Sequence, residues 1–210
     1  MLKKRWLFGC LTLGMILAGC MLFLFIGGNR QAEKVQDEVV RFHVVARSDS
    51  ARDQSLKIKV RNGLFSLLEE WFADCETRGE ALQTACARKE ELELAAEEIL
   101  QENGCDEQVT VTVEETFFPT KTYGSFSFPA GNYRAVNVRI GEARGKNFWC
   151  VLYPALCLAP AVAQKKAEDL LTPSLGKDGV DFLKKTGPKQ RIRFALAEWL
   201  AFLKQKYVNS

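Results

Sequence analysis

Hydrophobic and polar residues alternate with a period of two over residues 39–46, and this spacing predicts a β-strand. Val40, Phe42 and Val44 fall on one face of the strand, and Arg41 and His43 fall on the other. The segment Ser-Asp-Ser at residues 48–50 ends the strand, because its side-chain oxygens can accept hydrogen bonds from the first amides of a helix. A strand, a turn and a helix are therefore expected in this order.

Two rows of side chains run along the helix that follows. Ser50 and Asp53 resemble a capping box in which Asp replaces the usual Glu. Asp53, Lys57 and Arg61 form a polar row with a spacing of four residues, which a folded core does not require. The apolar row recurs at helical spacing and consists of Leu56, Val60, Leu64, Leu67 and Trp71.

Helical spacing and strand spacing follow one another in the chain after this helix. Residues 77–103 show helical spacing, and Asn103 with Gly104 supplies a left-handed stop. Period-two strands follow around residues 109–113, 126–128, 136–140 and 148–153, separated by turn-rich segments. This order predicts an α+β fold, in which an antiparallel sheet carries two long helices packed on one face.

The C-terminal part is expected to be helical at both ends. Pro160 opens a short helix to about residue 171, and residues 172–188 indicate a loop. Residues 190–207 form an amphipathic helix that packs on the domain or lies on a membrane surface. The expected organisation is an anchor or signal peptide at 1–28, a stalk at 29–37, an α+β domain at 38–158 and a helical extension at 159–210.

Residues 7–26 are apolar and long enough to cross a bilayer. The basic cluster at residues 3–5 places the N-terminus in the cytoplasm and the remainder outside. We favour an uncleaved signal anchor, because Gly27 and Gly28 make a poor cleavage site. A lipid attached to Cys20 is the alternative, although residues 21–26 stay apolar where a lipoprotein usually becomes polar.

Net charge is +3, and the three basic residues at positions 3–5 account for it. The remainder lacks the diffuse basic footprint of a nucleic-acid-binding protein. A single histidine and the absence of a Cys-x-x-Cys pair argue against zinc, and the sequence indicates no cofactor.

His43 beside the Ser-Asp-Ser turn invites comparison with a hydrolase. His43 and Ser48 would be about 16 Å apart along an extended strand, so a catalytic triad needs a sharp reversal of the chain. A Cys/His pair through Cys150 or Cys157 has no stronger support, and we expect no enzyme. His43 is either structural or faces a partner. The other classes left open are an extracytoplasmic hydrolase acting on cell wall and a membrane-anchored scaffolding module.

Three ordered blocks between residues 39 and 158 resemble the stage II sporulation protein R family. The second is Phe-Pro-Thr-Lys-Thr-Tyr-Gly at 118–124 with Pro-Ala-Gly at 129–131, and the third is Asn-Phe-Trp-Cys-Val-Leu-Tyr-Pro at 147–154 with Cys157. The matching residues of the first block are His43, Ala46, Ser48, Asp49, Ser50, Asp53, Gln54, Lys57, Val60 and Arg61. Two residues of this block depart from the family pattern: Arg47 stands where Asn is expected, and Asn62 stands where Asp is expected.

The resemblance implies a secreted signal made in the forespore that acts between two cells. Its expected partner is a membrane-bound aspartic protease of the mother cell, which cleaves a sporulation sigma-factor precursor. Cys150 and Cys157 are expected to form a disulfide on the oxidising side of the membrane. The residues expected to form one exposed partner-binding surface are His43, Ser48, Asp49, Ser50, Asp53, Gln54, Lys57, Arg61, Thr120, Lys121, Tyr123 and Gly124.

Overall fold

A computed structural model describes residues 14–15, 19, 30–156 and 164–185. The chain divides into two units, residues 1–34 and residues 35–210. The predicted anchor at 7–26 lies outside the described residues except for positions 14, 15 and 19, and the predicted helix at 190–207 lies outside them entirely. Within the described part, no helix is both long enough and apolar enough to span a bilayer.

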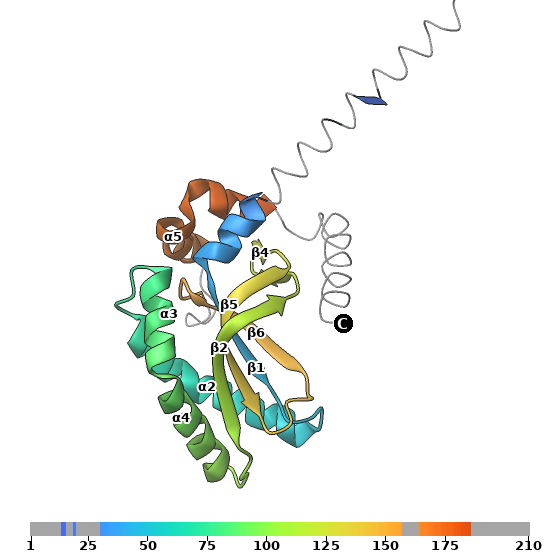
Figure 1. Cartoon of the computed structure of the whole chain (residues 1–210), viewed down its shortest axis with the longest axis vertical. Helices are drawn as coiled ribbons and strands as arrows, with labels where there is room; N and C mark the ends of the chain where they lie inside the picture. The colour runs from blue at the N-terminus through green and yellow to red at the C-terminus, as the bar shows by residue number, and fades with distance from the viewer. Residues whose placement is uncertain (1–13, 16–18, 20–29, 157–163, 186–210) are drawn as a thin grey trace, which may run out of the picture. The chain divides into compact units, whose positions relative to one another are not determined.

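In the described part of the second unit, one strand is followed by three helices, then by five strands and a last helix, as Figure 1 shows by colour along the chain. Its elements are β1 (Val40–Val45), α2 (Ala51–Phe72), α3 (Arg78–Ala87), α4 (Lys89–Glu102), β2 (Val109–Phe118), β3 (Lys121–Tyr123), β4 (Phe126–Phe128), β5 (Gly131–Ile140), β6 (Asn147–Tyr153) and α5 (Gln164–Lys185). The α+β class is confirmed.

The main sheet has the strand order β2-β5-β1-β6 among the described residues. β2 pairs antiparallel with β5, and β6 pairs antiparallel with β1. β1 and β5, however, run parallel. The prediction of an antiparallel sheet was therefore wrong for the central pair. The helices, β2 and the β3–β4 hairpin lie between β1 and β5 in the sequence, which gives the chain enough length for a parallel crossover.

One face of the sheet is covered by α2, α3 and α4. Alternation along the strands sends Phe42, Val44, Val136 and Val138 to this face, where they pack against the buried sides of the three helices. Leu64 of α2 is fully buried in this cluster. The helical layer was predicted, but residues 77–103 form two helices rather than one, because the chain breaks at Arg88 (φ −115°, ψ 17°).

The ends of these helices follow their sequence signals. Thr77 and Glu80 form a capping box at the start of α3. Gly104, with φ +67°, provides the left-handed residue expected after α4. Both ends are thus determined by local chemistry.

The opposite face carries a second apolar cluster at one end of the sheet. Ala135 and Val151 point to this face and pack with the β3–β4 hairpin and α5. Residues 172–185, predicted as a loop, belong to α5, which contains Pro173 and is kinked at Gly176. Burial of the apolar side chains of α5 overrides the weak helix propensity of proline and glycine.

The segment predicted as a stalk is helical from residue 30 to residue 38. Val35 and Val39 are buried in the second apolar cluster. Gln36 also donates a hydrogen bond from Nε2 to the carbonyl oxygen of Ala130, at 3.3 Å. From Val35 onward this segment is therefore part of the folded unit and not a free spacer.

Candidate functional site

The turn between β1 and α2 is held by a network of side-chain hydrogen bonds. Ser50 caps α2 by accepting from the backbone N–H of Asp53 at 3.1 Å, which confirms half of the predicted capping box. The Asp53 carboxylate does not close the box: it accepts from Ser48 Oγ and, at 3.1 Å, from Arg47 Nε. Gln54 Nε2 donates to the carbonyl oxygen of Ser48 at 2.9 Å. These contacts fix the turn from within.

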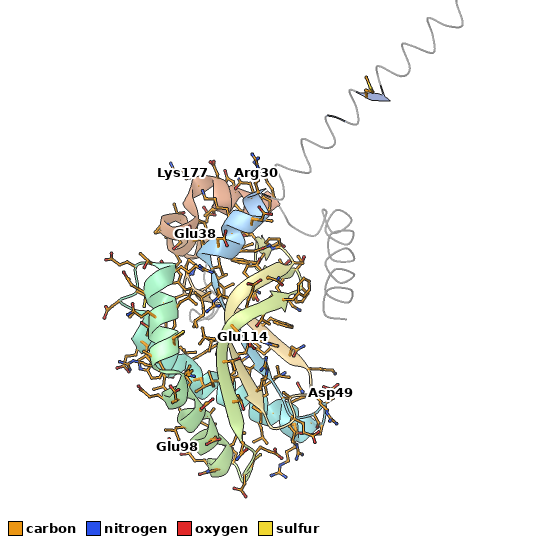
Figure 2. All side chains as sticks on the ribbon, viewed as in Figure 1. Arg30, Glu38, Asp49, Glu98, Glu114 and Lys177 are labelled. Carbon is orange, nitrogen blue, oxygen red and sulfur yellow. The ribbon has the colours of Figure 1, made fainter. Side chains whose placement is uncertain are left out.

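The same turn is bonded to the loop before β6. Asp49, labelled in Figure 2, accepts from the backbone N–H of Lys146 at 2.7 Å, and Lys57 Nζ donates to the carbonyl oxygen of Lys146 at 2.9 Å. Gly145 donates to the carbonyl oxygen of Ala46 at 2.9 Å, and a Cβ at Gly145 would overlap the carbonyl of Ser48. We call residues Ser48, Asp49, Ser50, Asp53, Gln54 and Lys57 the turn network.

Burial contradicts the expectation that the Asp53–Lys57–Arg61 row is an exposed surface. Asp53 and Lys57 are each only 5% exposed. Burial lowers the pKa of Lys57, and the hydrogen bond from Ser48 is the main cause that lowers the pKa of Asp53. Arg61 is half-buried, with its guanidinium carbon 4.7 Å from the centre of the Phe148 ring. The first two residues of the row therefore stabilise the turn.

Arg47, the main departure from the family pattern, is an exposed member of an ion-pair chain. Its Nε lies 3.1 Å from Asp53, and its Nη1 lies 2.8 Å from Glu107 in the segment between α4 and β2. The hydrogen bond to Asp53 is the largest cause of the raised pKa of Arg47. The charge that Arg47 adds to the turn is thus neutralised.

His43 belongs to the other face of the sheet. It is 8% exposed, and its imidazole stacks on the indole of Trp149. Nδ1 lies 3.0 Å from Asn137 Oδ1, and Nε2 lies 3.0 Å from Asn147 Oδ1. Burial is the largest cause of its lowered pKa, and the two hydrogen bonds oppose it. Each ring nitrogen of His43 is therefore hydrogen-bonded to an asparagine side chain, as expected if His43 has a structural role.

Arg41 lies two residues away on the same face and is fully buried. Its Nε donates to the carbonyl oxygen of Cys150 at 2.9 Å, and its Nη2 donates to Tyr123 Oη at 3.2 Å. Nη1 has no partner among the described residues. The guanidinium carbon lies 4.5 Å from the ring centre of Phe118 and 4.9 Å from that of Tyr133. Aromatic faces thus surround the cation, an arrangement that stabilises it electrostatically.

The β3–β4 hairpin brings the second motif block to this cluster. Tyr123 Oη accepts from Arg41 and donates to the carbonyl oxygen of Trp149 at 3.0 Å. The Lys121 ammonium lies 6.0 Å from the centre of the Trp149 ring. Thr120 Oγ1 accepts from the backbone N–H of Ala130 at 3.2 Å, and Gly124 turns the hairpin with φ +59°. We call Arg41, His43, Phe118, Tyr123, Tyr133 and Trp149 the Arg41 cluster.

The predicted partner-binding residues therefore divide into two groups. The turn network lies where β1 meets α2, while His43 and the hairpin residues Thr120–Gly124 lie toward the face opposite α2. A single surface formed by all of them was the wrong expectation. Sequence reasoning also missed Arg41 as a candidate, although a charged residue in the middle of a valine-rich strand was the signal that could have found it.

Cys150 is disulfide-bonded, whereas Cys75, Cys86 and Cys105 carry free thiols. Cys157 lies outside the described residues, so the Cys150–Cys157 pairing stays a prediction.

Elsewhere in the same unit, a cavity of about 680 Å³ lies between the end of α2, Tyr153 and α5. Its lining combines apolar side chains with Glu69, Glu76 and Asp169.

The side chains of the site that could do chemistry are engaged in hydrogen bonds that hold its shape. Within the described residues, His, Cys, Asp and Glu do not gather into a group of three that could hold a metal ion. Ser48 Oγ is bonded to Asp53, and the two nitrogens of His43 are bonded to asparagines. The triad arrangement considered for these residues is therefore not formed here.

Comparison with known proteins agrees with the motif blocks. The model of the family described as stage II sporulation protein R matches residues 36–163. Stage II sporulation protein R of Bacillus subtilis (strain 168) is 30% identical over 174 residues, covering 79% of this chain and 78% of that relative. No solved structure matches the chain. The matched range contains the whole sheet, α2–α4, the turn network and the Arg41 cluster, and the chain belongs to the stage II sporulation protein R family.

Proposed function

We propose that this chain is an exported sporulation signal that activates a membrane-bound aspartic protease of the mother cell. The activated protease then cleaves a sporulation sigma-factor precursor. The chain is made in the forespore and acts in the space between the two cells. In this proposal the chain is a protein ligand and not an enzyme.

Membership of the family is the observation that carries the proposal, because it establishes a role in sporulation. The rest follows from the resemblance of the three motif blocks to family members that signal between cells. The geometry of the described residues is compatible with a ligand, since the polar side chains of the turn network and of His43 are engaged with one another or with backbone.

Deletion followed by a blot for the sigma-factor precursor in sporulating cells tests this function. We expect the precursor to accumulate in the deletion strain and processing to return when the full chain is expressed in the forespore. Normal processing in the deletion strain would refute the proposal. Digestion of purified cell wall by the full chain would instead support the hydrolase alternative.

Export by the apolar segment at residues 7–26 is a separate part of the proposal. A reporter fused after Ser210 should be active only if it functions outside the cytoplasm. Activity of a reporter that works only in the cytoplasm would contradict this topology. A Cys20→Ala variant with unchanged membrane attachment would exclude the lipid alternative.

A further inference from the structure

Among the residues that the structure describes, the free edge of β2 is closed over its first half and open over its second. Among the described residues, β2 and β6 are the edge strands of the main sheet. β2 pairs with β5 in unbroken register from Val109↔Ile140 to Phe118↔Gly131. In a regular antiparallel ladder, alternate residues direct their N–H and C=O groups away from the neighbouring strand. The odd-numbered residues of β2 face outward, as the hydrogen bonds of Val109 and Val111 show.

Carboxylates of α4 close the first half of this edge. Glu97 accepts from the N–H of Val109 at 3.0 Å, and Glu93 accepts from the N–H of Val111 at 2.7 Å. Figure 1 shows α4 beside the first part of β2, while the later part curves away with β5. Side-chain acceptors of this kind prevent further strands from pairing there.

The second half has no such acceptors in the described part of the chain. The next outward N–H groups belong to Val113, Glu115 and Phe117, and no described residue bonds to them. Glu115 is exposed, and Phe117 is half-buried but packs in neither apolar cluster among the described residues. An open edge with an aromatic side chain outside both apolar clusters is suited to strand addition.

A second copy of the chain does not suit this edge. Because the edge is closed at Val111, two-fold antiparallel pairing over 113–117 must centre on Glu115. Each Glu115 would then lie directly opposite its copy, and like charges at such positions destabilise a strand pair. The favoured occupant therefore brings positive charge.

We propose that the edge at Val113–Phe117 accepts an extended segment of the partner protease as an additional strand. The inference rests on the proposed function, of which it names the docking surface. The added segment carries a lysine or arginine opposite Glu115 and an apolar side chain beside Phe117. Glu115 is available for this role: its cross-strand neighbour on β5 is Arg134, and no ion pair joins the two, whereas Glu114 is paired with Arg139 at 2.6 Å.

Photo-crosslinking in sporulating cells identifies the occupant directly. Benzoylphenylalanine replaces Phe117 in the full chain, and the control places it at Leu94, which is 62% exposed and belongs to α4, the helix that closes the first half of the edge. We expect the Phe117 probe to yield an adduct that contains the protease, and the Leu94 probe to yield none. An adduct of two copies, a crosslink to residues 186–210 of the same chain, or no adduct would overturn the proposal.

Two substitutions test whether the edge is used for activation. Glu115→Lys reverses the charge, and Glu115→Pro removes the outward N–H while the inward N–H groups of Glu114 and Thr116 remain. Each should lower sigma-factor processing by roughly tenfold or more at an equal level of folded protein. Glu98→Lys on α4, labelled in Figure 2, makes the same charge change away from the edge and should leave processing intact.

The two proposals fail in different ways. If deletion of the chain leaves processing normal, the proposed function is wrong. If deletion abolishes processing but folded Glu115→Lys and Glu115→Pro proteins both support it fully, the function stands and the β2 edge is not the docking surface.

Discussion

The imidazole of His43 lies flat on the indole of Trp149, with ring centroids 3.9 Å apart and planes within 2° of parallel. The two residues are direct cross-strand partners on β1 and β6. Phe118 contacts both rings edge-on, with centroid distances of 5.9 and 4.6 Å. The stack therefore links three strands of the sheet and keeps His43 away from water.

Stability should decrease as pH falls because of His43. Burial lowers its pKa in the folded protein, and the nearby charge of Arg139 acts in the same direction. Below about pH 6.5 the unfolded chain binds a proton that the folded chain still rejects, so the free energy of unfolding falls. We expect the thermal midpoint to fall from about pH 7 to about pH 5.5, and less steeply in His43→Gln. Equal slopes in both proteins would contradict this assignment.

Replacing Arg41 by lysine, which keeps the positive charge, should destabilise the fold more than replacing it by methionine, which removes the charge. Arg41→Lys keeps a buried cation but cannot donate to Cys150 and Tyr123 in the same planar geometry. Arg41→Met removes the charge and keeps most of the apolar volume. We expect unfolding free energy to fall by about 3 kcal/mol for Lys and by about 1 kcal/mol for Met. Chemical denaturation would measure both, and a more stable Lys variant would refute this account.

Lys57 and Arg61 should differ although they belong to one helical row. Lys57→Ala removes a buried ammonium and its charged hydrogen bond to the carbonyl of Lys146, and should cost about 2 kcal/mol. Arg61→Ala removes a half-buried side chain that, among the described residues, forms hydrogen bonds only with the neighbouring Asn62, and should cost less than about 1 kcal/mol. Thermal unfolding of the two variants is the measurement. Similar losses of stability in the two variants would mean that Lys57 and Arg61 play the same part in the fold, contrary to this prediction.

Two glycine-to-alanine substitutions should change the free energy of unfolding in opposite directions. At Gly145 the new methyl group would overlap the backbone carbonyl of Ser48, so we expect a loss of about 2 kcal/mol or more. At Gly79, inside α3, the nearest side-chain atom is 3.8 Å away at Thr77. Alanine there should stabilise the protein by about 0.5 kcal/mol. Denaturant midpoints would show the contrast, and a neutral Gly145→Ala would remove the need for close contact between the two turns.

Cysteine alkylation should separate the thiols into two classes. Cys75, Cys86 and Cys105 are free and should react after unfolding without reductant. Cys150 is disulfide-bonded and should react only after reduction. Peptide mapping of the exported protein should recover Cys150 joined to Cys157. Recovery of Cys150 joined to another cysteine would contradict the predicted pair.

Local chemistry in the sequence predicted the elements whose ends and faces depend on near neighbours. The β1–α2 junction capped by Ser50, the stop at Gly104 and the first half of the apolar row of α2 follow from adjacent residues. In the second half of α2 the prediction was off by one position, because Leu68 and Phe72 are buried while Leu67 and Trp71 are only half-buried. Prediction failed where distant packing decided the outcome. Residues 172–185 are helical despite Pro173 because Leu175 and Leu183 are buried against the second face of the sheet.

The sequence by itself determined the family, the α+β class and the residues of the turn network, because motifs, period and caps are properties of the linear chain. Only the tertiary structure decided the parallel pairing of β1 with β5 and the burial of Lys57. It also decided that Arg41 meets Tyr123 and that no described residue bonds to the second half of the β2 edge. Strand order and helix placement join residues far apart in sequence, and no local pattern encodes which partner each will meet.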